Sequence, residues 1–167
     1  IGVLARKHGV PIYATAGTIA EMKNMSSLGN IDEGLFREIH PDEKISINDI
    51  TIDPSSIWHD AADPVCYSLY GDGKKVSIAT DMGNFNDYIV DKLDNSDIMV
   101  VEANHDVRML EAGPYPYYLK RRILGNYGHL SNELSGQLIY RLLNNHVKGI
   151  LLGHLSNCLL YTSPSPR

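Results

Sequence analysis

Short apolar runs alternate with polar and helix-forming segments along most of the chain. Apolar or alternating positions predict strands at residues 11–14, 44–47, 50–52, 64–70, 75–80, 98–102 and 147–152. Helical patterns are predicted at residues 1–8, 19–24, 84–93, 106–112, 117–124 and 131–144, and a polar loop at residues 29–41. Gly71-Asp72-Gly73 predicts a hairpin turn, because glycine accepts a positive φ. This alternation predicts an α/β fold, in which functional residues gather after the strands.

Composition narrows the class of protein. The 167 residues are 43% hydrophobic and 21% charged, which predicts one globular domain with its own core. No run reaches the ~20 apolar residues of a membrane span, so no membrane association is expected. The net charge of -5 gives no overall attraction to nucleic acid. The two cysteines, Cys66 and Cys158, argue against a disulfide framework or a thiolate zinc site, and a reducing, cytoplasmic location is expected.

Both ends of the chain have unusual sequences. The chain starts at Ile1, not at methionine, and it starts inside a helical pattern, so we expect the native start to lie upstream. Residues 158–167 resemble the translation of a sequencing adapter; the alternative is a disordered Ser/Pro tail. The predicted organisation is therefore a partial domain over residues 1–157 and a non-native tail over residues 158–167.

Polar side chains collect directly after the apolar segments. They are His59, Asp60, Asp81, Asn104, His105, Asp106, His129 and His154. Histidine and aspartate are the ligands that divalent metals take when cysteine is absent. Each residue alone also has a structural interpretation, as a hydrogen-bonded loop histidine or a helix-capping aspartate. The pattern of positions alone leaves these two interpretations open.

Five sequence runs carry a resemblance to a known family. They are HDAADP at 59–64, ATDMG at 79–83, EANHD at 102–106, YGHLSN at 127–132 and LGHLSN at 152–157, accompanied by YPYYLKRRIL at 115–124. Together they resemble the YycJ/WalJ-type hydrolases of the metallo-β-lactamase superfamily, over residues 1–157 and in the same order. The resemblance implies an αββα sandwich with two divalent metal ions, of zinc, manganese or iron, at one edge of the sheet.

The resemblance also implies roles for individual residues. His59 resembles a ligand of the first metal, Asp81 the carboxylate that bridges both metals, and His154 the terminal ligand of the second. His129 resembles a histidine beside the leaving group, where it can donate a proton. The remaining candidates are residues that orient ligands or contact the substrate, namely Asp60, Asn104, His105, Asp106, Lys120 and Arg121, with Glu102 as a further orienting group. For Asp60 and Asp106 a surface helix cap is an equal alternative.

The family pattern also contains an HxHxDH motif and an aspartate on an earlier strand. No HxHxDH occurs in this chain. We therefore expect the metallo-β-lactamase fold to be incomplete, without the N-terminal part of its first sheet, and apolar surface to be left uncovered.

The function implied by the resemblance is metal-dependent hydrolysis of a phosphodiester, in its sharpest form a 5'-to-3' DNA exonuclease. Lys120, Arg121 and Arg122 lie beside several tyrosines and favour DNA, although a solvated helix face is the alternative. A hydrolase of the same fold acting on a small ester, thioester or cyclic phosphate is the second hypothesis, since a fold hosts many chemistries. The third is that this polypeptide alone is an inactive fragment. DNA or another phosphodiester is the expected partner, and no obligate protein partner is expected.

Overall fold

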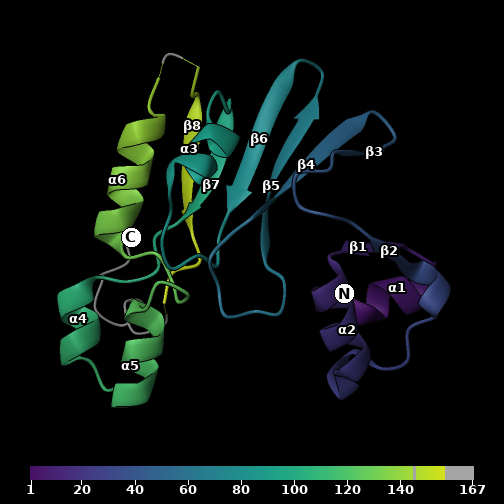
Figure 1. The fold of residues 1–167 in the computed structure, drawn as a ribbon, viewed down its shortest axis with the longest axis horizontal. Helices are drawn as coiled ribbons and strands as arrows, with labels where there is room; N and C mark the ends of the chain where they lie inside the picture. Colours follow the sequence, from purple (N-terminus) through teal and green to yellow (C-terminus); the bar gives the residue numbers. More distant parts are fainter. Residues whose placement is uncertain (145, 157–167) are drawn as a thin grey trace, which may run out of the picture.

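A six-stranded mixed sheet forms the centre of the molecule (Figure 1). The computed structural model describes residues 1–144 and 146–156, so Cys158 and the tail at residues 158–167 lie outside the described residues. The strands, in their spatial order, are β3 (Ile45–Ile47), β4 (Ile50–Ser56), β5 (Val65–Gly71), β6 (Lys74–Ala79), β7 (Ile98–Glu102) and β8 (Gly149–Gly153).

The direction of the strands explains where the polar residues meet. β3 to β6 pair antiparallel, and the predicted turn between β5 and β6 has positive φ at Asp72 and Gly73. β6, β7 and β8 are parallel, with Ile78 paired to Val100 and Val100 to Leu151. The carboxyl ends of these three strands therefore lie at one edge of the sheet, and the segments that follow them start side by side (Figure 1).

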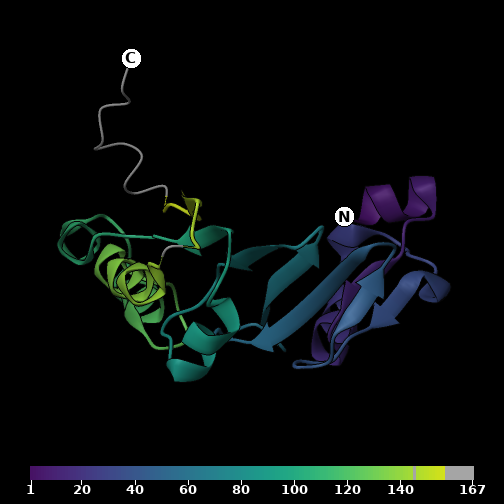
Figure 2. The ribbon, with the colours of Figure 1, turned by 90° about the horizontal axis from the view of Figure 1, so that it is seen from above.

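One face of the sheet carries the core. α3 (Asp87–Leu93) and α6 (Asn132–Leu142) contact each other (Figure 2). Their apolar side chains share one buried cluster with residues of the sheet. Leu93 and Leu138 are at most 1% exposed, as are Met99 and Val101 of β7. Burial raises the pKa of the Cys66 thiol to about 12, as expected for a cysteine that serves as a small core residue.

The opposite face of the sheet is apolar but less covered. Strand pairing places Leu69, Val76 and Ile98 in one row across this face, and Ile78, Val100 and Leu151 in another. Ile78 and Ile98 are 39% and 40% exposed, and Leu151 is 56% exposed. The apolar residues of β6 and β7 thus point to both faces of the sheet, which is the pattern of strands buried on two sides.

The N-terminal residues form a small unit at the β3 end of the sheet (Figure 1). It contains α1 (Gly2–His8), β1 (Ile12–Ala14), α2 (Ala16–Asn24), the short 3-10 turns Ser26–Leu28 and Glu33–Leu35, and β2 (Phe36–Glu38). The prediction of a loop over residues 29–41 is wrong at β2, which pairs parallel with β1. A strand of three residues is too short to show a periodic pattern in the sequence. β2 forms because β1 is present to pair with it. Thr15 connects the unit to the loop after β4 through a hydrogen bond from its Oγ1 to the carbonyl of Asp63, at 2.7 Å.

Two more helices lie below the carboxyl edge of the sheet in Figure 1. They are α4 (Val107–Ala112) and α5 (Tyr117–Leu124). Side-chain caps start three of the helices, because the side chains of Asn86, Asp106 and Ser131 accept backbone N–H groups of the first turn of α3, α4 and α6. The cap at Asn86 explains why α3 starts later than the predicted residue 84. No helix within residues 1–144 and 146–156 combines the length and apolar character that crossing a bilayer requires.

Candidate metal and catalytic site

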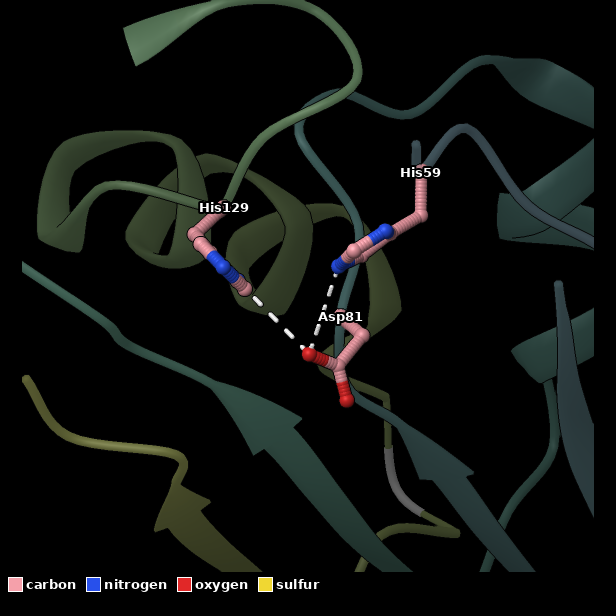
Figure 3. A group of neighbouring side chains, drawn as sticks. All are labelled: His59, Asp81 and His129. Atoms are coloured by element: carbon pink, nitrogen blue, oxygen red, sulfur yellow. Dashed lines mark ion pairs between the residues drawn. The ribbon is translucent and has the colours of Figure 1, made fainter. Parts of the chain in front are cut away.

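Five titratable side chains converge at the carboxyl edge of the sheet. Asp81 follows β6, Glu102 ends β7 and His154 follows β8, while His59 and His129 come from the loops after β4 and before α6. Figure 3 shows His59 and His129 pointing from two sides toward the carboxylate of Asp81. The structure thus brings together the three predicted ligands and the predicted proton donor.

Asp81 lies at the centre of three imidazole rings. Its Oδ1 lies 3.4 Å from Nε2 of His59, 3.7 Å from Nδ1 of His129 and 3.5 Å from Nδ1 of His154. The rings of His59 and His129 meet edge to face with centroids 5.2 Å apart, and those of His129 and His154 with centroids 4.9 Å apart. Three imidazole rings thus surround one carboxylate.

The backbone at two of these positions is unusual. Asp81 has φ 57° and His154 has φ 55°, so both lie in the left-handed region that most L-residues avoid. Each residue lies within two positions of the end of a parallel strand, and the left-handed conformation turns the chain sharply there. This turn keeps both side chains at the edge of the sheet.

Glu102 organises the two histidines on the far side of Asp81. Its side chain is fully buried, and its Oε1 lies 2.8 Å from Nδ1 of His129 and 2.7 Å from Nδ1 of His154. Its Oε2 accepts the backbone N–H of Met82 at 2.9 Å. Burial alone would raise the pKa of Glu102, but these hydrogen bonds outweigh burial and lower it. The hydrogen bond to Glu102 also raises the pKa of His129, against the effect of burial.

These distances decide between two functions for Glu102. A group formed by Glu102, His129 and His154 has donor atoms close enough to surround a metal ion. However, 2.7–2.8 Å is the length of a charge-assisted hydrogen bond, and such a bond places the proton on Nδ1 of each ring. Nε2 of each ring then faces away from Glu102, where it can bind a cation in the neutral imidazole or carry a proton in the imidazolium. Glu102 therefore orients the two histidines, which leaves the carboxylate of Asp81, rather than that of Glu102, to contact a cation together with the surrounding imidazoles.

His59 is held through its other ring nitrogen. Its Nδ1 lies 2.9 Å from Oδ1 of Asp60 and 3.0 Å from the backbone N–H of Ala61. Nδ1 can donate to Asp60 or accept from Ala61, but it cannot do both in one tautomer. A cation bound at Nε2 would favour the tautomer with the proton on Nδ1, and Asp60 would then be the partner of that proton.

Asp60 is in turn fixed by α5. The Arg122 guanidinium forms a two-point ion pair with its carboxylate, in which Nη2 and Oδ1 are 3.0 Å apart and Nε donates to Oδ2. This hydrogen bonding lowers the pKa of Asp60 and keeps the carboxylate charged. Arg122, Asp60 and His59 thus form a chain of contacts that leads from α5 to Asp81.

Asn104 and His105 hold the loops of the site from inside. The Asn104 side chain donates to the carbonyl of His154 at 2.8 Å, and its backbone N–H donates to the carbonyl of Leu130. His105 is 1% exposed, its Nδ1 lies 3.3 Å from Oδ1 of Asn104, and burial lowers its pKa. Both side chains therefore support the segments of His129 and His154, and the burial of His105 keeps it away from a substrate.

The remaining predicted residues have different surroundings. Asp106 is the N-cap of α4, where its Oδ1 accepts the N–H of Met109 at 2.8 Å, so the cap alternative describes it. Lys120 donates to the carbonyl of Glu111 at 2.6 Å, and Arg122 is paired with Asp60. Arg121 is exposed and forms no ion pair with any residue that the structure describes. The three basic residues therefore do not form one uniform phosphate-binding face.

Two members of the site are more central in the structure than the sequence predicts. Glu102 was expected only as a further orienting group, although a carboxylate that directly ends an apolar strand is a signal of its own, because burying it requires partners. The pairing of Arg122 with Asp60 joins residues 62 positions apart, and no local pattern indicates it.

Comparisons with known proteins agree with this architecture. The family profile described as the beta-lactamase superfamily domain matches residues 1–147. Exodeoxyribonuclease WalJ of Streptococcus pneumoniae is 39% identical over 156 residues, and exodeoxyribonuclease YycJ of Bacillus anthracis is 34% identical; in both cases the match covers 93% of this chain and 58% of the relative. Zn²⁺-bound PqqB from Methylobacterium extorquens has the same fold, with a TM-score of 0.63 and 14% identity over 93% of this chain and 58% of PqqB.

The chain thus spans a little over half the length of the curated relatives that it matches. The resemblance to YycJ/WalJ-type hydrolases and the expected fold class are confirmed. With the family profile matching most of its length, this chain belongs to the beta-lactamase superfamily and has the metallo-β-lactamase fold.

Proposed function

We propose that this chain supplies metal-binding and catalytic residues of a metal-dependent DNA exonuclease. The observation that carries the proposal is the convergence of His59, His129 and His154 on Oδ1 of Asp81. The two curated relatives named as exodeoxyribonucleases support DNA as the substrate. In this proposal the substrate is a phosphodiester, and the small-ester alternative predicts no cleavage of DNA.

The donor set fits divalent metal ions. His59, Asp81 and His154 would hold them, because imidazole and carboxylate donors suit zinc, manganese or iron. We propose that the complete protein would hold two such ions, with Asp81 among their ligands. Bound metal would polarise the phosphate and lower the pKa of water that attacks it.

The protein's own residues position the site histidines and protonate the leaving oxygen. Glu102 fixes Nδ1 of His129, so Nε2 of His129 faces away from Glu102 and can donate a proton to the departing oxygen. Asp60 and Arg122 hold His59, while Asn104 holds the loop of His154. Each side chain around Asp81 is thus oriented before substrate arrives, which is the arrangement that favours catalysis.

Metal removal tests the proposal directly. The protein that carries this chain is incubated with end-labelled DNA, with Mn²⁺ or Zn²⁺ and after treatment with EDTA. We expect stepwise shortening of the DNA with metal, no shortening after chelation, and recovery when metal is returned. Shortening that persists after chelation, or hydrolysis of a small thioester with no action on DNA, would reject the nuclease proposal.

Arg122 offers a sharper test of the metal site. Arg122→Ala removes the partner of Asp60 and leaves Asp60 free to turn away from Nδ1 of His59. Loss of an outer contact of this kind weakens metal binding, here by about tenfold. Calorimetric titration with Zn²⁺ measures the change, and Arg121→Ala is the control, because it removes the same charge one residue away. Equal affinities in the two variants would contradict the proposed role of Asp60.

A further inference from the structure

A cavity opens beside the candidate site on the side of α5. Its volume is about 330 Å³, and the imidazoles of His129 and His154 form part of its wall. The same two rings lie within 3.7 Å of Asp81 Oδ1, so a group bound in the cavity lies next to any phosphate held at Asp81. Ligand pockets start at about 300 Å³, so this space suits one small unit of a polymer.

The lining has two chemically different parts. Leu119 and Ile123 of α5 and Leu155 after β8 provide an apolar surface. Tyr115 and Ser156 provide hydroxyl groups, and their oxygen atoms lie 3.5 Å apart. A flat apolar ring with polar edges matches such a lining, because its faces contact the aliphatic side chains while its edges reach the hydroxyls.

The charges in the cavity argue against a phosphate as its occupant. Arg122 is the only lysine or arginine among the described residues that line it. Its Nε and Nη2 are already engaged by the carboxylate of Asp60. A terminal phosphate would need unpaired cationic donors, whereas an uncharged base and sugar would not.

We propose that this cavity binds the terminal nucleoside of the DNA strand, the one whose oxygen leaves when the phosphodiester is cut. The inference rests on the proposed nuclease function and adds the recognition of one nucleoside to it. During the reaction the oxygen of water forms a bond to phosphorus and its proton passes to solvent. The bond from phosphorus to the sugar oxygen of the bound nucleoside breaks, and that oxygen takes a proton from Nε2 of the His129 imidazolium, which solvent then protonates again. Because the cavity holds one nucleoside, the products are single nucleotides.

A DNA substrate that lacks its terminal base tests recognition of the base separately from cleavage of the phosphodiester. The substrates are an oligonucleotide and the same oligonucleotide in which a tetrahydrofuran ring, a stable sugar analogue without a base, replaces the terminal nucleoside. We expect the wild-type protein to prefer the complete end by about tenfold in kcat/KM. Equal rates on the two ends would overturn the inference and leave the nuclease function standing. Failure to cut either one with metal present would overturn both.

Substitutions that fill the cavity test the same inference, each with a control substitution outside the cavity. Leu119→Trp occupies the space for the base and is expected to remove the preference for the complete end. Leu124→Trp is the control, because Leu124 lies on the same helix, is 40% exposed and does not line the cavity. If Leu119→Trp does not fold, Tyr115→Ala is used in its place, with Tyr118→Ala as its control, since Tyr118 is 75% exposed and outside the lining. A cavity variant that keeps the tenfold preference would overturn the inference.

Discussion

Asp81→Asn is expected to lower kcat/KM for DNA by at least about a thousandfold, which corresponds to roughly 4 kcal/mol of lost transition-state stabilisation. The substitution removes the negative charge that three imidazoles surround at 3.4–3.7 Å. Asparagine has nearly the same shape and tolerates the left-handed backbone that Asp81 adopts, so the fold should survive. The loss then reflects the site and not unfolding.

Steady-state kinetics, the metal content of the purified protein and its thermal unfolding together check this expectation. Asp87→Asn is the matched control, because Asp87 lies on α3 and pairs with Arg141 on the surface. His154→Ala should reproduce the loss seen with Asp81→Asn. Turnover of either site variant at the wild-type rate would refute the assignment of these residues.

The largest expected effect on stability is at Gly128. A Cβ atom there would lie 2.2 Å from the carbonyl oxygen of Arg122 and 2.3 Å from that of Ile123, and both are backbone atoms that cannot turn aside. Gly128→Ala must therefore push the loop of His129 away from the end of α5. Overpacking of this severity should lower the free energy of unfolding by about 3 kcal/mol, and should also displace His129.

Denaturant unfolding measures the stability of this variant. Gly136→Ala provides the comparison, because nothing lies within 4 Å of a Cβ at this position within α6. That substitution should raise stability by about 0.5–1 kcal/mol, since alanine loses less backbone entropy than glycine in a helix. The steric argument fails if Gly128→Ala proves as stable as the wild-type protein.

Local pattern predicted those elements whose signal lies within their own residues. The strand at residues 98–102 and the helix at residues 117–124 match β7 and α5, because a continuous apolar run and an amphipathic repeat are local properties. β2 was missed because it depends on β1, and the start of α3 was misplaced because the cap at Asn86 sets it.

The site also combines features that local sequence predicts with features that only tertiary packing sets. The identities of His59, Asp81, His129 and His154 followed from motifs, and parallel strand ends place such residues together. The central place of Glu102 did not follow, because the 2.7 Å and 2.8 Å distances to two histidines are set by tertiary packing. The different surroundings of the basic residues Lys120, Arg121 and Arg122 could not be predicted either, because they depend on neighbours that are distant in the sequence.

The left-handed backbone at Asp81 and His154 means that this protein loses some folding stability in order to place two functional side chains. Holding a residue other than glycine in this region costs about 1 kcal/mol or more at each position. Glycine at both positions would relieve that cost and yield a sturdier but inert molecule. Selection for thermal stability alone would therefore favour substitutions at these two positions. Selection for catalytic turnover is needed to retain an aspartate and a histidine there.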